Sequence, residues 1–138
     1  MTLDIVPYGH PALRAKGRRI ENIDAWIRAL ANEMLETMYA AEGVGLAAQQ
    51  VGLPVQLCVI DVKGVKDRPS TLRIDGQAAD IGEHMPLVLI NPEIELCGKP
   101  EIGVEGCLSF PGVRSDVTRS AAVRVRAQSL DGEMLEFE

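Results

Sequence analysis

Apolar positions repeat every three to four residues between residues 23 and 38, and this is the spacing of one helix face. Charged residues occupy the intervening positions, so the pattern predicts one amphipathic helix with a buried stripe formed by Ile23, Trp26, Ile27, Leu30, Met34, Leu35 and Met38. Asn22 or Asp24 can cap its start, because both side chains accept hydrogen bonds from free amide groups. Gly43 lies where a glycine would release the chain after the last turn.

Two short apolar runs predict buried strands. Residues 55–62 are almost continuously apolar between Pro54 and Lys63, as in a strand that is covered on both faces. Residues 87–90 form a second run, which Asn91 and Pro92 interrupt. Residues 94–96 then resume an extended path before turn signals at Gly98 and Pro100.

The C-terminal part predicts a hairpin. Val123, Val125 and Ala127 alternate with polar residues, which is the period of a half-exposed strand, and Asp131-Gly132 supplies a turn into residues 134–137. Residues 63–85 are polar and longer than the roughly 12–15 residues usual for a loop, so we expect a mobile surface insertion. One helix followed by several antiparallel strands predicts an α+β fold in a single domain, residues 1–138.

Composition narrows the possible functions. Of the 138 residues, 46% are hydrophobic and 25% are charged, as in ordinary globular domains. The net charge of −6 disfavours nucleic-acid binding, and we read the basic cluster near Arg14 and Arg18 as a solvated loop without function. The N-terminal residues have an early acid, a proline and no long apolar run, so we expect neither a signal peptide nor a membrane span, and a cytoplasmic location.

The three cysteines lack the CxxC spacing of a zinc site and are odd in number, which disfavours a disulfide framework. Cys58 lies inside an apolar strand and should be an inert core residue, and we expect the same of Cys97. Cys107 is different, because glycine and polar residues flank it in Glu105-Gly106-Cys107-Leu108-Ser109. Its setting leaves open a metal ligand, a nucleophile or a structural thiol.

A second notable segment covers residues 43–50, Gly-Val-Gly-Leu-Ala-Ala-Gln-Gln. Small residues directly after a helix let the backbone approach a ligand or another strand closely, although glycine pairs also occur at ordinary helix exits. The segment lacks the Lys-Ser/Thr pair of a phosphate-binding loop.

Taken together, residues 43–50 and 105–109 resemble the first and second signature motifs of peptide deformylases. Residues 5–11, 88–92 and 111–114 add to the similarity, which covers essentially the whole chain. The resemblance implies removal of the N-formyl group from the formylmethionine of nascent polypeptides at the ribosome. A metal-activated water would attack the formyl carbonyl, and the metal would be Fe²⁺, with Zn²⁺, Ni²⁺ or Co²⁺ as substitutes.

The resemblance also implies site residues. Cys107 matches the family's thiolate metal ligand. The Gln50 side-chain amide and the Leu108 backbone N–H match the two donors that stabilise the oxyanion. Further positions match the lining of the peptide groove, and these are Val44, Gly45, Glu105 and Gly106, with Arg114 near the groove's mouth.

One part of the family pattern is missing. Peptide deformylases take two further ligands and a general base from a third motif, His-Glu-x-x-His, on a C-terminal helix, whereas the only histidines here are His10 and His84. We therefore expect a deformylase-like fold without its metal-binding helix, with part of the core exposed. Because Cys107 would supply one of the three protein ligands of a catalytic site, we expect weak metal binding and no appreciable activity.

Three interpretations follow from the sequence. In the first, the 138 residues are the C-terminally incomplete part of a deformylase. In the second, they form a catalytically dead module or partner subunit that retains the groove and binds peptides. In the third, a second chain supplies the missing helix.

Overall fold

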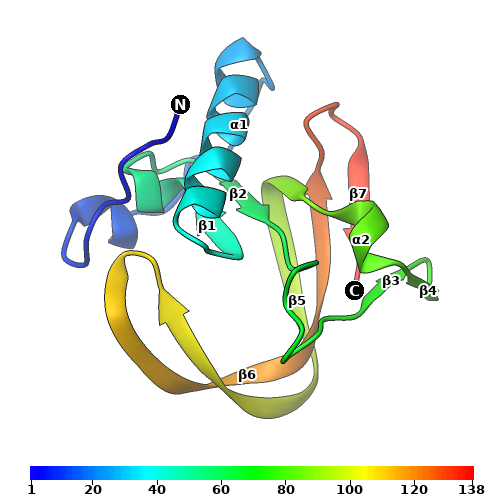
Figure 1. Ribbon diagram of the computed structural model, residues 1–138. Helices are drawn as coiled ribbons and strands as arrows, with labels where there is room; N and C mark the ends of the chain where they lie inside the picture. Colours follow the sequence, from blue (N-terminus) through cyan, green and yellow to red (C-terminus); the bar gives the residue numbers. More distant parts are fainter.

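The computed structural model describes residues 1–138 and shows one long helix packed on a five-stranded antiparallel sheet (Figure 1). The predicted α+β class is confirmed. The sheet has the order β1-β2-β5-β6-β7, and its strands are β1 (Gly45–Ala47), β2 (Leu57–Ile60), β5 (Leu87–Cys107), β6 (Phe110–Gln128) and β7 (Met134–Phe137). A short 3₁₀ helix, η1 (Pro11–Arg14), precedes the long helix α1 (Ala25–Ala40). A second 3₁₀ helix, η2 (Ala48–Val51), follows β1.

Helix α1 begins at the expected cap. Asp24 Oδ1 accepts a hydrogen bond from the Ile27 amide at 3.0 Å, which satisfies one of the free amides of the first turn. The prediction that Gly43 ends the helix is wrong, because the residue that takes the left-handed conformation after the last turn is Glu42, with φ of 56°. The assignment of Trp26 to the buried face is also wrong, since its side chain lies 54% exposed.

The main core lies between α1 and one face of the sheet. Met34 and Met38 on the helix are fully buried against Val59 of β2 and Ile90 of β5. A smaller core lies on the opposite face, where Leu89, Val125 and Ala127 pack with partly buried side chains of β7. Both faces of β2 are therefore covered, as its apolar run predicted.

The long hairpin of β5 and β6 departs from the sequence prediction. The chain does not break at Asn91-Pro92 or turn at Gly98, because β5 passes through both places with register shifts against β6. Asn91 and Gly98 take left-handed conformations, with φ of 52° and 75°, and accommodate the extra residues as bulges. The bulges bend the ribbon, so its tip returns towards the N-terminal segment (Figure 1).

Residues 63–85 contain more structure than the predicted loop. They hold a small hairpin of β3 (Leu72–Ile74) and β4 (Gln77–Ala79), followed by the short helix α2 (Ile81–His84). Arg73 exchanges two backbone hydrogen bonds with Glu138, which ties this hairpin to the end of β7. The mobility of the segment stays a prediction.

The C-terminal hairpin agrees with the sequence. Residues 125–128 of β6 pair antiparallel with β7, and Gly132 in the connecting turn has φ of 81°. No helix is long and apolar enough to cross a membrane.

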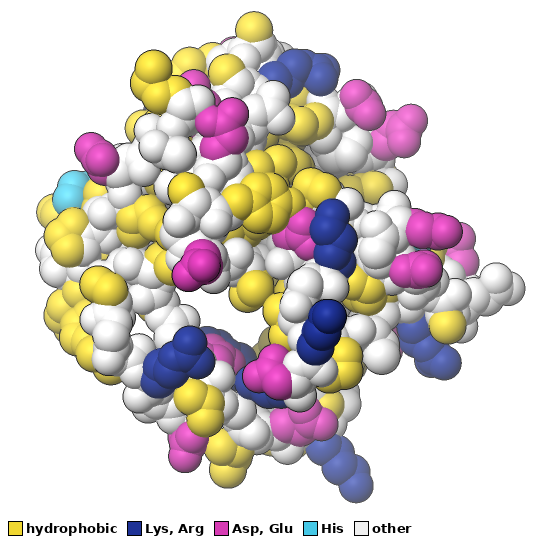
Figure 2. All heavy atoms as spheres, in the orientation of Figure 1, with side chains coloured by type: hydrophobic (Ala, Val, Ile, Leu, Met, Phe, Trp, Pro, Cys, Tyr) yellow, Lys and Arg dark blue, Asp and Glu magenta, His cyan; other side chains and the backbone are white.

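The far part of the β5–β6 hairpin exposes apolar side chains. Ile94, Leu96 and Ile102 are between 63% and 73% exposed, although each belongs to a strand. Figure 2 shows an opening between this arc and the body formed around α1, with hydrophobic side chains at its margins. Apolar strand residues that lie open in this way are consistent with the exposed core that the sequence predicted.

Candidate active site

The structure brings residues 43–50 and 105–109 together at one point. Gln50 lies on η2, and Cys107 is the last residue of β5. The Gln50 amide nitrogen lies 3.6 Å from Cys107 Sγ, and Gln50 Oε1 accepts a hydrogen bond from the Ala47 amide at 3.0 Å. The bond to Ala47 fixes the orientation of the side-chain amide, so that its NH₂ group is directed at the exposed sulfur.

Gly43 provides a second link between the two segments. A Cβ atom at Gly43 would lie 2.6 Å from Leu108 Cδ1, which is closer than real Cβ atoms approach their neighbours. Leu108 can therefore pack over this position only because no side chain is present there. The same packing places the Leu108 side chain against the first segment.

Two of the predicted groove residues, Gly45 and Gly106, lie on strand segments with one unpaired edge, whereas the Val44 carbonyl is already bonded. Gly45 begins β1, which is an outer strand of the sheet, and Val44 accepts a hydrogen bond from the Asp61 amide at 2.9 Å. Gly106 lies opposite Arg114 near the tip of the hairpin, in a part of β5 that pairs only with β6. Edges of this kind can accept an extended peptide as an added strand.

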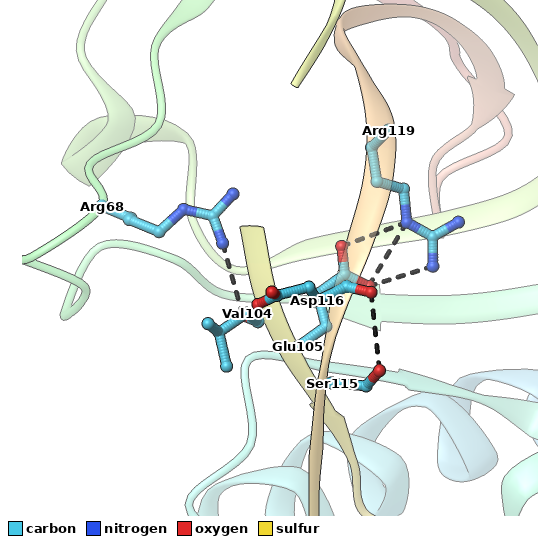
Figure 3. A network of polar contacts seen from close by, with 6 residues as sticks. All are labelled: Arg68, Val104, Glu105, Ser115, Asp116 and Arg119. Carbon is cyan, nitrogen blue, oxygen red and sulfur yellow. Dashed lines mark hydrogen bonds and ion pairs between the residues drawn. The ribbon is translucent and has the colours of Figure 1, made fainter. Parts of the chain in front are cut away.

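Glu105 forms an ion pair that the sequence did not predict. Arg119 of β6 binds both carboxylate oxygens of Glu105 through Nε and Nη2, at 3.0 to 3.3 Å (Figure 3). The hydrogen bonds from Arg119 lower the pKa of Glu105; burial opposes this effect, and the charges of Arg119 and Arg68 add to the lowering. Arg68, which belongs to residues 63–85, also donates to the Val104 carbonyl at 3.4 Å. The sequence alone could not pair Arg119 with Glu105, because the two residues lie on neighbouring strands and their proximity depends on the register between β5 and β6.

A second polar pair lies directly beside the first segment. The Tyr39 hydroxyl donates to Asp61, whose side chain is only 4% exposed. This bond raises the pKa of Tyr39 to about 12, with smaller contributions from burial and from the Asp61 charge. Burial of Asp61 opposes its ionisation, yet hydrogen bonds from Tyr39 and Lys63 leave the pKa of Asp61 below its usual range.

The three cysteines differ in their surroundings. Cys58 is half-buried but packs against the smaller core, and burial raises its pKa to about 11, so the thiol stays protonated near neutral pH. Cys97 is only half-buried, so its assignment to the core is wrong, because that part of the hairpin has no cover. Cys107 is exposed.

The donor set does not fit a catalytic metal ion. Among residues 1–138, no group of three His, Cys, Asp or Glu side chains could hold one. His10 accepts a hydrogen bond from the Ala12 amide at the start of η1, and His84 contacts the Asp80 carbonyl on α2. Cys107 is thus the one candidate ligand at the site, whereas catalytic zinc sites use three protein ligands.

Comparison with known proteins shows similarity along the whole chain. The profile of the family described as polypeptide deformylase matches residues 2–138. A peptide deformylase from Methylacidiphilum infernorum is 51% identical over 138 residues, which are 100% of this chain and 72% of the relative. The chloroplastic peptide deformylase 1B of Solanum lycopersicum is 40% identical over 98% of this chain and 43% of its own length.

Solved structures agree with these sequence matches. Peptide deformylase from Thermotoga maritima superposes with a TM-score of 0.81 at 33% identity, over 99% of this chain and 80% of that one. The enzyme from Synechococcus elongatus, solved in complex with actinonin, gives 0.80 at 38% identity, over 97% of this chain and 63% of that one. These relatives are all longer than the 138 residues described here.

Proposed function

Because this chain belongs to the polypeptide deformylase family, we propose that residues 1–138 form the formylpeptide-binding half of a deformylase site. The family's reaction is hydrolysis, in which water adds to the formyl carbonyl, the carbon–nitrogen bond breaks, and formate leaves a free amino terminus. We propose N-formylmethionyl peptides as the ligands. We also propose the cytoplasm as the compartment, although the tomato relative is described as chloroplastic.

The position of Gln50 beside Cys107 carries this proposal. The amide NH₂ is oriented by the Ala47 amide and reaches to 3.6 Å from the sulfur, so a carbonyl bound there would meet a fixed donor. The backbone N–H of Leu108 would supply the second donor. Paired, pre-oriented donors stabilise the negative charge that develops on the carbonyl oxygen, and the loss of one typically costs about 10²–10³ in rate.

We further propose that these residues alone do not turn over substrate appreciably. The family's metal would be held by Cys107 together with two histidines, and neither His10 nor His84 is placed to help. The polypeptide would then retain the donors and the groove, while a metal would bind only weakly.

The test is turnover of a formyl-Met peptide by the purified protein. Anaerobic Fe²⁺ would be supplied at one equivalent, with Ni²⁺, Co²⁺ and Zn²⁺ in parallel, and bound metal would be measured after desalting. We expect substoichiometric metal and no turnover above that of Cys107→Ser. Near-stoichiometric metal with clear turnover would contradict the proposal, and Gln50→Ala should then lower that turnover by about 10²–10³ if the role of Gln50 is correct.

A metal-independent peptide-binding module is the second candidate, and the unpaired edges at β1 and β5 favour it. Calorimetry without metal would compare a formyl-Met peptide with its unformylated counterpart. Preferential binding of the formylated peptide, weakened in Gln50→Ala, would support this function. Equal or absent binding of the two peptides would exclude it.

A further inference from the structure

The N-terminal segment runs past both halves of the candidate site. The Val6 amide donates to the Gln50 carbonyl at 2.8 Å, and two residues later the Tyr8 amide donates to the Ser109 carbonyl, also at 2.8 Å. Successive donors on one side of an extended segment have a fixed spacing. Residues 6–8 therefore hold η2 and the hairpin tip at a set separation, which agrees with the tip lying beside the N-terminal segment (Figure 1).

The Tyr8 side chain adds a contact to the hairpin tip. Its ring meets that of Phe110 edge-to-face, with centroids 5.0 Å apart and an interplanar angle of 89°. Phe110 is the register partner of Cys107 and closes the hairpin with it. The ring of Tyr8 thus buttresses the residue that pairs with Cys107, while the Tyr8 amide holds the carbonyl of the intervening turn.

The hairpin tip depends on contacts with the N-terminal segment, because the rest of the β5–β6 ribbon is packed against little else. Leu96 and Ile102, further back along β5, are more than 70% exposed, so neither a helix nor another strand covers this part. A two-stranded ribbon on its own is only marginally stable. Without the N-terminal segment, little beyond the packing of Leu108 over Gly43 would keep Cys107 next to Gln50.

We propose that Tyr8 is a positioning residue, which acts through Phe110 and Ser109 to keep Cys107 within reach of Gln50. The inference rests on the proposed function only in giving Gln50 and Cys107 a shared role. Tyr8 is 64% exposed, so its replacement would not uncover the core.

The test measures how closely positions 50 and 107 are held, without metal or peptide. Gln50→Cys in a Cys97→Ser background introduces a second thiol on η2, on the side that faces Cys107. Equilibration with reduced and oxidised glutathione then gives the effective concentration of the pair, and peptide mapping identifies the disulfide. We expect a measurable effective concentration, and Tyr8→Ala to lower it by about two- to tenfold, as for the loss of an edge-to-face contact. Tyr8→Phe should keep the original value.

Trp26→Ala is the matched control, since Trp26 is an aromatic residue of similar exposure on α1. It should leave the effective concentration unchanged. If Tyr8→Ala does not fold, Tyr8→Leu removes the aromatic edge while keeping an apolar side chain and should give the same fall. Two results would overturn the inference: an effective concentration that neither Tyr8→Ala nor Tyr8→Leu lowers, or an equal fall with Trp26→Ala. Because the readout needs neither turnover nor peptide, it stands apart from the tests of the proposed function.

Discussion

Tyr39 donates a 2.5 Å hydrogen bond to the carboxylate of Asp61 and so joins the last turn of α1 to the end of β2. The Asp61 amide in turn donates to the Val44 carbonyl at 2.9 Å. The connection that carries Gly43 and Val44 is thereby held at both ends. A polar pair outside the proposed site thus fixes the shape of the loop leading into the groove.

The stability contributed by this pair should depend on pH at both extremes. The pKa of Tyr39 is raised to about 12, so its contribution is complete below about pH 10 and is lost as the pH rises towards 12. The pKa of Asp61 is lowered, so its contribution is present above about pH 4 and is lost as the pH falls through the folded-state value.

Tyr39→Phe tests this dependence. Near neutral pH we expect the free energy of unfolding to fall by about 1 kcal/mol, because a hydrogen bond to a charged group is lost at a half-exposed side chain. Urea unfolding of both proteins between about pH 2 and 12 should show the difference shrinking below about pH 4 and above about pH 10. A difference that is constant across this range would argue against the pair as its source.

Gly43 and Gly45 should respond differently to an added methyl group. Gly43→Ala would place its Cβ 2.6 Å from Leu108 Cδ1, so Leu108 must move, at a cost of about 1–2 kcal/mol. Gly45→Ala would meet only the Val59 carbonyl at 3.8 Å, which is ordinary contact, and should be nearly neutral. Urea denaturation compares the two variants. Equal losses of unfolding free energy would show that the packing of Leu108 does not require a glycine at position 43.

Asn91 should be among the polar residues most sensitive to replacement. Its side chain bonds both the Ile20 amide and the Ile20 carbonyl, at 2.8 and 2.9 Å, and the residue is buried. Asn91→Ala leaves these groups unpaired and should cost about 2–4 kcal/mol. Asn91→Gly loses the same bonds but tolerates the φ of 52°, so it should be about 1 kcal/mol less harmful than alanine. If the alanine variant is the more stable of the two, backbone strain at this bulge is not significant.

The ion pair between Glu105 and Arg119 should add little to stability despite its two-pronged geometry. Arg119 is 68% exposed, so water and salt screen the charges. A double-mutant cycle with Glu105→Gln and Arg119→Ala should give a coupling below about 1 kcal/mol, and the coupling should fall at 1 M salt. Arg124 and Glu95, 3.7 Å apart on the same hairpin, provide a matched pair for comparison. A coupling of several kcal/mol would mean that the guanidinium is shielded from solvent.

The parts of the fold that were predictable are those with local signals. The period of α1, the Asp24 cap and the Asp131-Gly132 turn depend on neighbours in sequence, and all three are confirmed. The course of β5 was not predictable, because Pro92 and Gly98 are turn signals in isolation. Pairing with β6 absorbs them as bulges, and this pairing joins residues far apart in the chain.

The same distinction applies to the candidate site. Resemblance to a family pointed to Gln50 and Cys107, which do lie side by side, although their roles stay predictions. Tyr8, Tyr39 and Arg119 were missed because each meets a partner on another element. No spacing within one segment reveals such a partner.

The bond between the Tyr8 amide and the Ser109 carbonyl has a consequence for the order of folding. Residue 8 is made early in translation and its partner late, so at about 5–20 residues per second the N-terminal segment waits roughly 5–20 seconds for the hairpin. During that time the Tyr8 amide has only water as a partner. Helix α1 can form at once from local contacts, whereas Gln50 can meet Cys107 only after the β5–β6 hairpin has been made. A pause or a chaperone acting during that interval would therefore delay the assembly of the candidate site.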